Sequence, residues 1–213
     1  MNLHRRNQWV QVLYPLFAYY VLYYVSDEIA LSYLGEGREM VALLFATVVT
    51  LGPIALLYHR ALPSKEDIPK TRREWLMEGL YILGIALLGL KINLIAQNLP
   101  LLEYSSGYGK ASYVLSSGSI FLRILVLGIL TPFLEELVFR GLILGQMLGW
   151  MDVKWAVVIS SALFGILHFN VVQFLYATIM GVLLGALYVK TQKVWTTWAA
   201  HGLCNLLVLF LIG

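Results

Sequence analysis

Long apolar segments, separated by short polar or charged stretches, follow one another along all 213 residues of the chain. A helix needs about 20 apolar residues to cross a bilayer, and most of these segments have about that length. The pattern therefore predicts an all-α fold, a polytopic transmembrane helix bundle of about seven helices that forms one membrane domain over residues 1–213. The predicted spans lie approximately at residues 9–26, 39–58, 75–98, 119–149, 154–169, 171–189 and 194–212.

The first and fourth segments need a closer reading. The first ends at Ser26-Asp27-Glu28 without the small-residue pattern of a cleavage site, so we predict a retained helix rather than a signal peptide. Residues 119–149 are too long for one straight span, and Thr131-Pro132 lies in their middle. Threonine is a common helix N-cap and proline is favoured at the first helical position, so we predict that a new helix begins there.

Lysine and arginine are distributed unequally between the two sides of the predicted bundle. The opposite side from the N-terminus has two cations, Arg38 and Lys110, and is otherwise acidic. Because cytoplasmic loops are enriched in Lys and Arg, we predict a cytoplasmic N-terminus and, with an odd number of spans, an external C-terminus. The cations on the N-terminal side are Arg5, Arg6, Arg60, Lys65, Lys70, Arg72, Arg73, Lys154, Lys190 and Lys193.

Composition agrees with a membrane protein and excludes several other classes. Apolar residues make up 60% of the chain and charged residues 13%, with a mean hydropathy of +0.77. Soluble domains contain roughly 45–50% apolar and about 25% charged residues. The net charge of +3 comes without a long basic run, so we expect no nucleic-acid partner. The single cysteine, Cys204, excludes an intrachain disulfide and a Cys-x-x-Cys metal site.

Ionisable side chains inside membrane spans cost about 2.5–3.5 kcal/mol each on insertion scales, so their positions point to function. The carboxylates at positions 135 and 136 and two histidines lie in the last four predicted spans. Carboxylates and imidazoles are the groups that hydrolases use for acid and base catalysis. The full set within the predicted spans is Glu78, Lys91, Arg123, Glu135, Glu136, Arg140, His168 and His201.

The sequence Glu135-Glu136-Leu-Val-Phe-Arg140 gives its two carboxylates different surroundings. Glu136 and Arg140 are four residues apart, so they share a helix face and can pair. Glu135 points about 100° away around the helix. A purely structural Glu–Arg clasp between helices is an alternative for Glu136 and Arg140. It leaves Glu135 without a partner in the membrane, which favours a working role for that carboxylate.

Two histidines follow, in Phe164-Gly-Ile-Leu-His168 and in His201-Gly-Leu-Cys-Asn205. Glu135 lies 16 residues before the turn at Met151 and His168 lies 17 after it, so antiparallel helices bring them to similar depth. His201 and Asn205 are four residues apart and therefore lie on one helix face. The alternative for each histidine motif is a packing role, with the polar side chain bonded to a neighbouring helix.

The three motifs together, EELVFR, FGILH and HGLCN, resemble the EExxxR, FxxxH and HxxxN signatures of the CPBP family. This family comprises the type II CAAX prenyl proteases and the bacterial Abi proteins of bacteriocin processing and bacteriocin immunity. The resemblance covers roughly residues 119–212, and the first three spans look generic. It implies an intramembrane protease that hydrolyses peptide bonds with activated water in a cavity inside the bundle.

The resemblance also implies a role for each motif residue. Glu135 would be the general base, with His168 holding and polarising the water. His201 and Asn205 would stabilise the oxyanion, and Glu136 with Arg140 would support the site. His168, His201 and Glu135 would also suit zinc or another divalent metal, as a His₂Glu set. The family is often named as metalloproteases and has also been described as metal-free glutamate peptidases, so both chemistries stay open.

Two other functions remain open at this point. A non-proteolytic membrane protein, such as an immunity factor or scaffold, could carry the same motifs. A proton-coupled transporter also uses buried Glu and His, although the sequence has no inverted repeat. For the protease, the expected partners are the lipid bilayer and a membrane-associated peptide or protein substrate. The short chain suggests a prokaryotic plasma membrane, which favours peptides over prenylated proteins.

Overall fold

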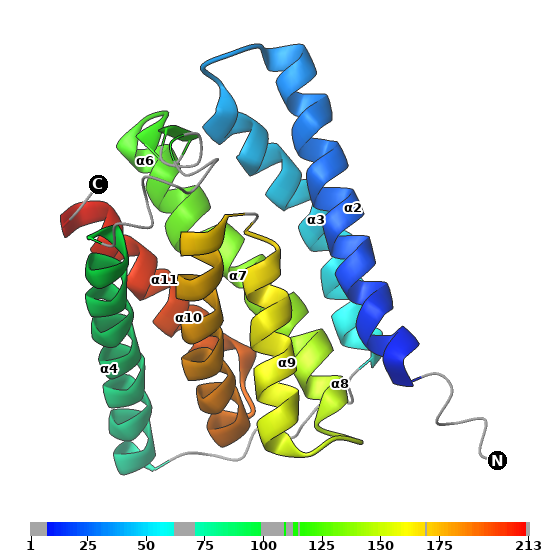
Figure 1. The fold of residues 1–213 in the computed structure, drawn as a ribbon, viewed down its shortest axis with the longest axis vertical. Coiled ribbons are helices and arrows are strands. Elements are labelled where there is room, and N and C mark those ends of the chain that lie inside the picture. The colour runs from blue at the N-terminus through cyan, green and yellow to red at the C-terminus, as the bar shows by residue number, and fades with distance from the viewer. Residues whose placement is uncertain are drawn as a thin grey trace.

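The computed structural model describes residues 8–61, 71–98, 109, 113–114, 116–168 and 170–211, and these form a bundle of helices (Figure 1). The all-α prediction is therefore confirmed. Three long helices come first, α2 (Gln8–Leu34), α3 (Glu39–Ala61) and α4 (Arg72–Gln97). Three more close the chain, α9 (Val153–Ile166), α10 (Val171–Thr191) and α11 (Val194–Leu211).

Between these two groups runs one unbroken helical segment, residues 120–147, which we call the central rod. It alternates α-helical and π-helical stretches, and every residue of its η3 stretch is buried. Its parts, in order, are α6 (Ile120–Arg123), η2 (Ile124–Leu130), α7 (Thr131–Glu136), η3 (Leu137–Leu144) and α8 (Gly145–Met147).

Each predicted span coincides with a helix or, for residues 119–149, with the central rod. Four helices, α3, α4, α10 and α11, are individually long and apolar enough to cross a membrane. Helix α9 is a shorter apolar helix of 14 residues. The chain is therefore an integral membrane protein.

Helix α2 is longer than predicted, because it passes through Asp27 and Glu28 and ends at Leu34. Exposed charges near a helix end do not stop a helix, whereas glycine in the left-handed region does. Gly35 and Gly37 follow directly, with φ of 76° and 81°. The glycines, not the acidic residues, therefore set the end of this helix.

The α-helical stretch α7 does begin at Thr131, but the predicted N-cap and the break in the helical path are wrong. Thr131 has helical angles, φ −63° and ψ −47°, and does not act as an N-cap. Pro132 cannot donate a backbone hydrogen bond, and the π-helical stretch before it gives the chain a way to continue without a break. The Thr131 hydroxyl oxygen lies 3.3 Å from that of Thr47 on α3. The rod thus carries Glu135 and Glu136 into the interior of the bundle.

The helices are arranged around the central rod (Figure 1). The α2–α3 hairpin lies on one side, where α2 contacts η3 and α8, and α3 contacts η2, α7 and η3. Helix α4 lies on the opposite side, against α11 and α10. Helix α11 contacts η2 and α7, and α9 packs along η3. Residues from α2, the rod, α9 and α11 therefore meet at the centre.

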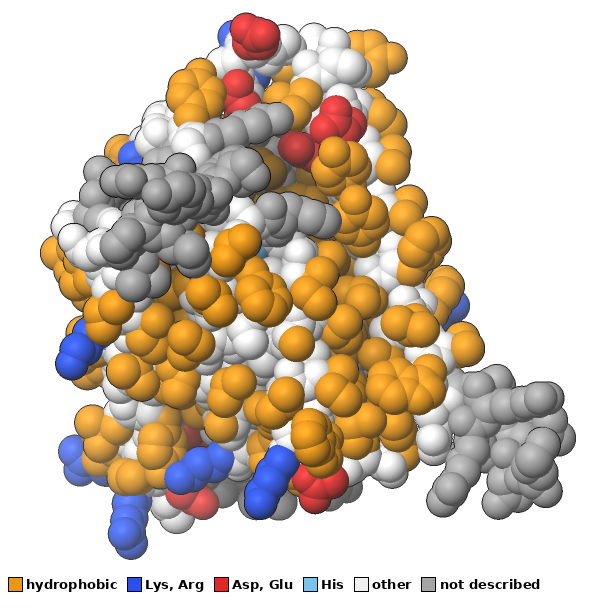
Figure 2. Space-filling model, viewed as in Figure 1, with side chains coloured by type: hydrophobic (Ala, Val, Ile, Leu, Met, Phe, Trp, Pro, Cys, Tyr) orange, Lys and Arg blue, Asp and Glu red, His pale blue; other side chains and the backbone are white. Residues whose placement is uncertain are grey.

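Figure 2 shows an apolar band around this bundle with charged side chains gathered at its two ends. In this view, most of the visible Lys and Arg side chains lie along the lower edge, and acidic side chains lie at both ends. Several cations lie near helix ends at the end of the bundle from which α2 starts. They include Arg60, Arg72, Lys154, Lys190 and Lys193. The cytoplasmic orientation of that end stays a prediction. Arg5, Arg6, Lys65, Lys70 and Lys110 lie outside the described residues.

Helix α11 approaches the rod most closely at two glycines. A Cβ atom built on Gly202 would lie 2.4 Å from the carbonyl oxygen of Gly128 in η2. Backbone cannot move aside as a flexible side chain can, so Gly202→Ala should lower the free energy of unfolding by about 1–3 kcal/mol. Thermal unfolding in detergent micelles measures the loss.

Gly84→Ala in α4 is the matched control, because nothing lies within 4 Å of a Cβ built there. Alanine is the better helix former by about 1 kcal/mol, so this variant should be at least as stable as the wild type. Equal stability of the Gly202→Ala and Gly84→Ala proteins would show that α11 and the rod do not require this close approach.

Candidate active site

The deepest polar cluster joins Glu136, Arg140 and His201. The Glu136 carboxylate oxygen Oε1 accepts a hydrogen bond from Arg140 Nη1 at 2.8 Å and another from His201 Nδ1 at 3.0 Å. Glu136 and Arg140 are fully buried. The predicted Glu136–Arg140 pair is therefore confirmed, and His201 is a third member that the helix spacing did not reveal.

Arg140 also ties the rod to two other helices. Its Nη2 donates to the carbonyl oxygen of Gly181 on α10 at 3.3 Å. Its guanidinium carbon lies 4.7 Å from the ring centroid of Phe164 on α9, within the range of a cation–π contact. Together with Glu136 and His201, this one side chain links η3, α9, α10 and α11. The cluster fixes how these helices meet.

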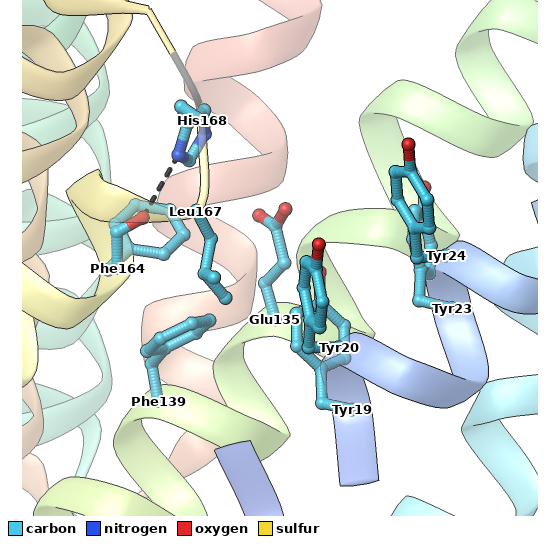
Figure 3. Close-up of a pocket in the computed structure, with 9 residues that line it drawn as sticks. All are labelled: Tyr19, Tyr20, Tyr23, Tyr24, Glu135, Phe139, Phe164, Leu167 and His168. Carbon is cyan, nitrogen blue, oxygen red and sulfur yellow. Dashed lines mark hydrogen bonds between the residues drawn. The ribbon is translucent and has the colours of Figure 1, made fainter. Parts of the chain in front are cut away.

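Glu135 faces a different surface, as the predicted rotation around the helix requires. Its side chain is 15% exposed, and its Oε2 lies 3.8 Å from Nε2 of His201. The carboxylate reaches into a cavity of about 220 Å³ (Figure 3). One of two adjacent carboxylates is thus held by a cation and a histidine, while the other is presented to open space.

His168 lines the same cavity as Glu135, as the helix-length argument predicts. The prediction that His168 lies within a span is corrected, since α9 ends at Ile166 and His168 sits in the turn before α10. That turn is short because the Asn170 side chain caps α10. His168 Nδ1 lies 3.0 Å from the carbonyl oxygen of Phe164. A carbonyl oxygen can only accept, so Nδ1 carries the proton and Nε2 is left for the cavity.

Asn205 contacts the central rod, and its predicted oxyanion role stays a prediction. Its Nδ2 donates to the carbonyl oxygen of Leu127 in η2 at 3.0 Å, and it does not line the cavity. His201 and Asn205 do share one face of α11, and both contact the central rod. For Asn205, however, the packing alternative describes the observed contact.

The predicted metal ligands can be tested against the donors that the structure provides. His201 and His168 each have Nδ1 engaged with an acceptor, which is how metal-ligating histidines are commonly held. Within the described part of the chain, however, no three side chains among His, Cys, Asp and Glu are grouped to hold one ion. The set of His168, His201 and Glu135 is therefore not assembled as a metal centre here. Metal dependence stays a prediction.

Sequence reasoning missed much of the cavity wall. Helix α2 contributes four lining tyrosines, Tyr19, Tyr20, Tyr23 and Tyr24, so the expectation that the first spans are generic is wrong for α2. Phe139 of the rod, with Phe164 and Leu167 of α9, lines the rest. The signal was present in the spacing, because each pair four residues apart, Tyr19 with Tyr23 and Tyr20 with Tyr24, shares a helix face, and the two faces are adjacent.

Comparisons with known proteins agree with the motif assignment. The family model described as "Type II CAAX prenyl endopeptidase Rce1-like" matches residues 117–207, a region that contains all three motifs. YdiL of Bacillus subtilis (strain 168), provisionally described as a membrane peptidase, is 31% identical over 165 residues. That match covers 74% of this chain and 66% of YdiL, slightly less than two thirds of the relative. No solved structure matches the chain.

The matched region also contains the residues that converge at the centre of the bundle. All of them lie between residues 117 and 207, on the rod, in the turn after α9 and on α11: Glu135, Glu136, Arg140, His168 and His201. With the ordered motifs, the helical membrane bundle and a relative described as a membrane peptidase, the chain is similar to the type II CAAX prenyl endopeptidases of the CPBP family over the region that carries the three motifs.

Proposed function

We propose that this protein is an intramembrane endopeptidase that hydrolyses peptide bonds of a membrane-associated peptide or protein. The observation that carries the proposal is the division between two adjacent carboxylates. Glu136 is neutralised by Arg140 and bonded to His201, whereas Glu135 faces an aromatic-lined cavity. A carboxylate held in a cavity, with a histidine beside it, is suited to general base catalysis.

Glu135 is the general base in this proposal. It takes a proton from a water molecule in the cavity, and the resulting hydroxide attacks the carbonyl carbon of the scissile peptide bond. The tetrahedral intermediate then collapses, the C–N bond breaks, and the proton passes from Glu135 to the leaving amine. No covalent bond to the enzyme is formed, and the carboxylate is regenerated.

The two histidines have different parts, which follow from their hydrogen bonds. Nδ1 of His168 donates to the Phe164 carbonyl, so Nε2 of the neutral ring accepts and can hold the water. Nδ1 of His201 donates to Glu136, so His201 can donate from Nε2 only as an imidazolium. The imidazolium would stabilise the oxyanion, a contribution that is largest where water is scarce.

Asn205 acts indirectly in this scheme. Its bond to Leu127 holds α11 against η2 and so keeps His201 one turn away in place. Glu136 and Arg140 likewise position His201 and the rod rather than touching the substrate. We therefore assign Glu135, His168 and His201 to the chemistry and the other three motif residues to its support.

The substrate class is proposed from the family. The matching family model is described as "Type II CAAX prenyl endopeptidase Rce1-like", and the motif resemblance also includes Abi proteins that process bacteriocins. Prenylated CAAX tails, bacteriocin leader peptides and peptide pheromones are therefore the panel to test. Purified protein in liposomes should generate new peptide termini, detected by mass spectrometry. A panel without any cleavage product would contradict the proposed activity.

Chelation tests the metal prediction. A divalent metal would polarise the scissile carbonyl and lower the energy of forming hydroxide. The scheme above needs only side chains and water, so dialysis against a chelator should leave the cleavage rate within about twofold of the untreated protein. A rate that is lost on chelation and restored by zinc would instead assign His168 and His201 as metal ligands. Zinc bound at about 2.0–2.1 Å from both rings would establish that outcome structurally.

A further inference from the structure

Helix α2 presents a continuous aromatic surface to the cavity, which we call the tyrosine face (Tyr19, Tyr20, Tyr23 and Tyr24). The inner rings, Tyr19 and Tyr23, have centroids 5.6 Å apart, and the outer rings, Tyr20 and Tyr24, stack at 5.6 Å with an interplanar angle of 17°. All four line the cavity that Glu135 also lines (Figure 3).

The aromatic surface continues across the floor of the cavity. Tyr19 packs edge-on against Phe139 at 6.0 Å, and Phe139 packs edge-on against Phe164 at 5.0 Å. Phe164 in turn contacts the rings of His168 and His201, at 5.0 and 5.8 Å. An unbroken series of rings therefore joins α2 to the two catalytic histidines.

An aromatic belt at the membrane surface does not account for the tyrosine face. Belt residues face lipid headgroups, whereas Tyr19 is 7% exposed and packs inside the bundle beside Glu135. Tyr20 and Tyr24 are 37% and 49% exposed and form the outer part of the same cavity wall. The four rings form one surface with a buried end at the carboxylate and an accessible end away from it.

The size and lining of the cavity limit what can bind. Its volume of about 220 Å³ is below the 300–1,000 Å³ of typical sites for drug-sized ligands. It suits one large side chain and its adjoining peptide group better than a long lipid chain. Glu135 and His168 are the ionisable groups of the lining, and the remaining lining residues are aromatic apart from Leu167.

We infer that the tyrosine face is the specificity surface of the site and binds a large, flat apolar side chain, such as phenylalanine, next to the scissile bond. Aromatic rings offer offset and edge-on contacts to another ring that an aliphatic wall cannot offer. This inference rests on the proposed function for the peptide nature of the ligand.

Two labelled membrane-partitioning peptides that differ at one position, Phe or Ala, provide the test. Binding is measured by fluorescence anisotropy on the Glu135→Gln protein in micelles, and cleavage by mass spectrometry on the wild-type protein. The Phe peptide should bind at least about 10-fold more tightly than the Ala peptide, the lower end of the range for one side chain in an apolar pocket.

The variants test whether that advantage comes from α2. Tyr20→Ala and Tyr24→Ala, each made in the Glu135→Gln background, should reduce the ratio of Phe to Ala affinity by roughly 2- to 12-fold, as expected for the loss of one aromatic pair. Tyr24→Phe keeps the ring and should keep the ratio. Tyr14→Ala is the matched control, since Tyr14 is on the same helix, is 58% exposed and does not line the cavity.

The two readouts separate this inference from the proposed function. A Phe advantage that is lost in Tyr20→Ala, without cleavage by the wild-type protein, would support the specificity surface and contradict the endopeptidase. Cleavage of both peptides with equal affinity would support the endopeptidase and overturn the inference. Equal sensitivity of the ratio to Tyr14→Ala and Tyr20→Ala would also overturn it, because the effect would then be a general one on the helix.

Discussion

The Glu135→Gln protein is expected to fold and insert normally but to cleave peptides about 10²–10⁴-fold more slowly than the wild type, the usual contribution of a general base. The amide has nearly the same shape as the carboxylate and cannot accept the proton of water. Initial rates with a cleaved peptide, measured at equal concentrations of folded protein, give the factor.

The structure explains why folding should not suffer from this change. Glu135 lies outside the buried Glu136–Arg140 cluster, and its Oε2 lies 3.8 Å from Nε2 of His201. Glu28→Gln on the exposed face of α2 is the matched control and should leave the rate unchanged. Near-normal turnover by the Glu135→Gln protein would refute the assignment of the base.

The helices could be predicted because membrane spans have a strong and local sequence signal. An apolar run of about 20 residues is sufficient for a span, and polar residues or glycines usually mark its ends. The local signal misled at Thr131-Pro132, where the pattern of an N-cap was read as a helix start. The π-helical stretch η2 ends at Leu130 and passes directly into α7, and no short-range pattern distinguishes that continuous path from a break.

The site could be predicted only as far as its residues are related by helix geometry. The Glu136–Arg140 pair follows from a spacing of four residues, and the shared depth of Glu135 and His168 follows from a hairpin. The bond between His201 and Glu136 crosses 65 positions and depends on how α11 packs on the rod. Asn205 shows the same limit, since its partner is a backbone carbonyl whose place the sequence does not reveal.

The tyrosine face illustrates another kind of omission. Its spacing was visible, but aromatic residues in a first span suit several roles, including lipid-facing and interfacial ones. Only the packing of α2 against η3 places these rings opposite Glu135. The four tyrosines form a cavity wall without charged residues and belong to no recognisable sequence motif. Their position beside the catalytic carboxylate of Glu135 could therefore be found only from the fold.

Replacing Arg140 by Ala should cause the largest loss of stability of any single change at the site. The substitution leaves Glu136 buried with His201 as its remaining partner and removes the contacts to Gly181 and Phe164. Breaking a buried ion pair by removing one partner costs about 3–5 kcal/mol. We therefore expect a protein that unfolds at much lower temperature in micelles and is inactive.

Lys91→Ala is the control, because Lys91 is an exposed cation of α4, and its loss should cost no more than about 0.5 kcal/mol.

A double variant shows whether the loss comes from the stranded charge. In the Glu136→Leu/Arg140→Met protein neither charge is left unpaired, and replacing a whole buried pair by apolar side chains is often neutral. Its loss of stability should therefore be smaller than the sum of the two single losses, with a coupling of about 0.5–3 kcal/mol. Activity should not return, because His201 no longer has the carboxylate that orients it. A monodisperse Arg140→Ala protein with wild-type stability would contradict a stabilising Glu136–Arg140 ion pair. Additive losses in the double variant would show that Glu136 and Arg140 stabilise the bundle independently.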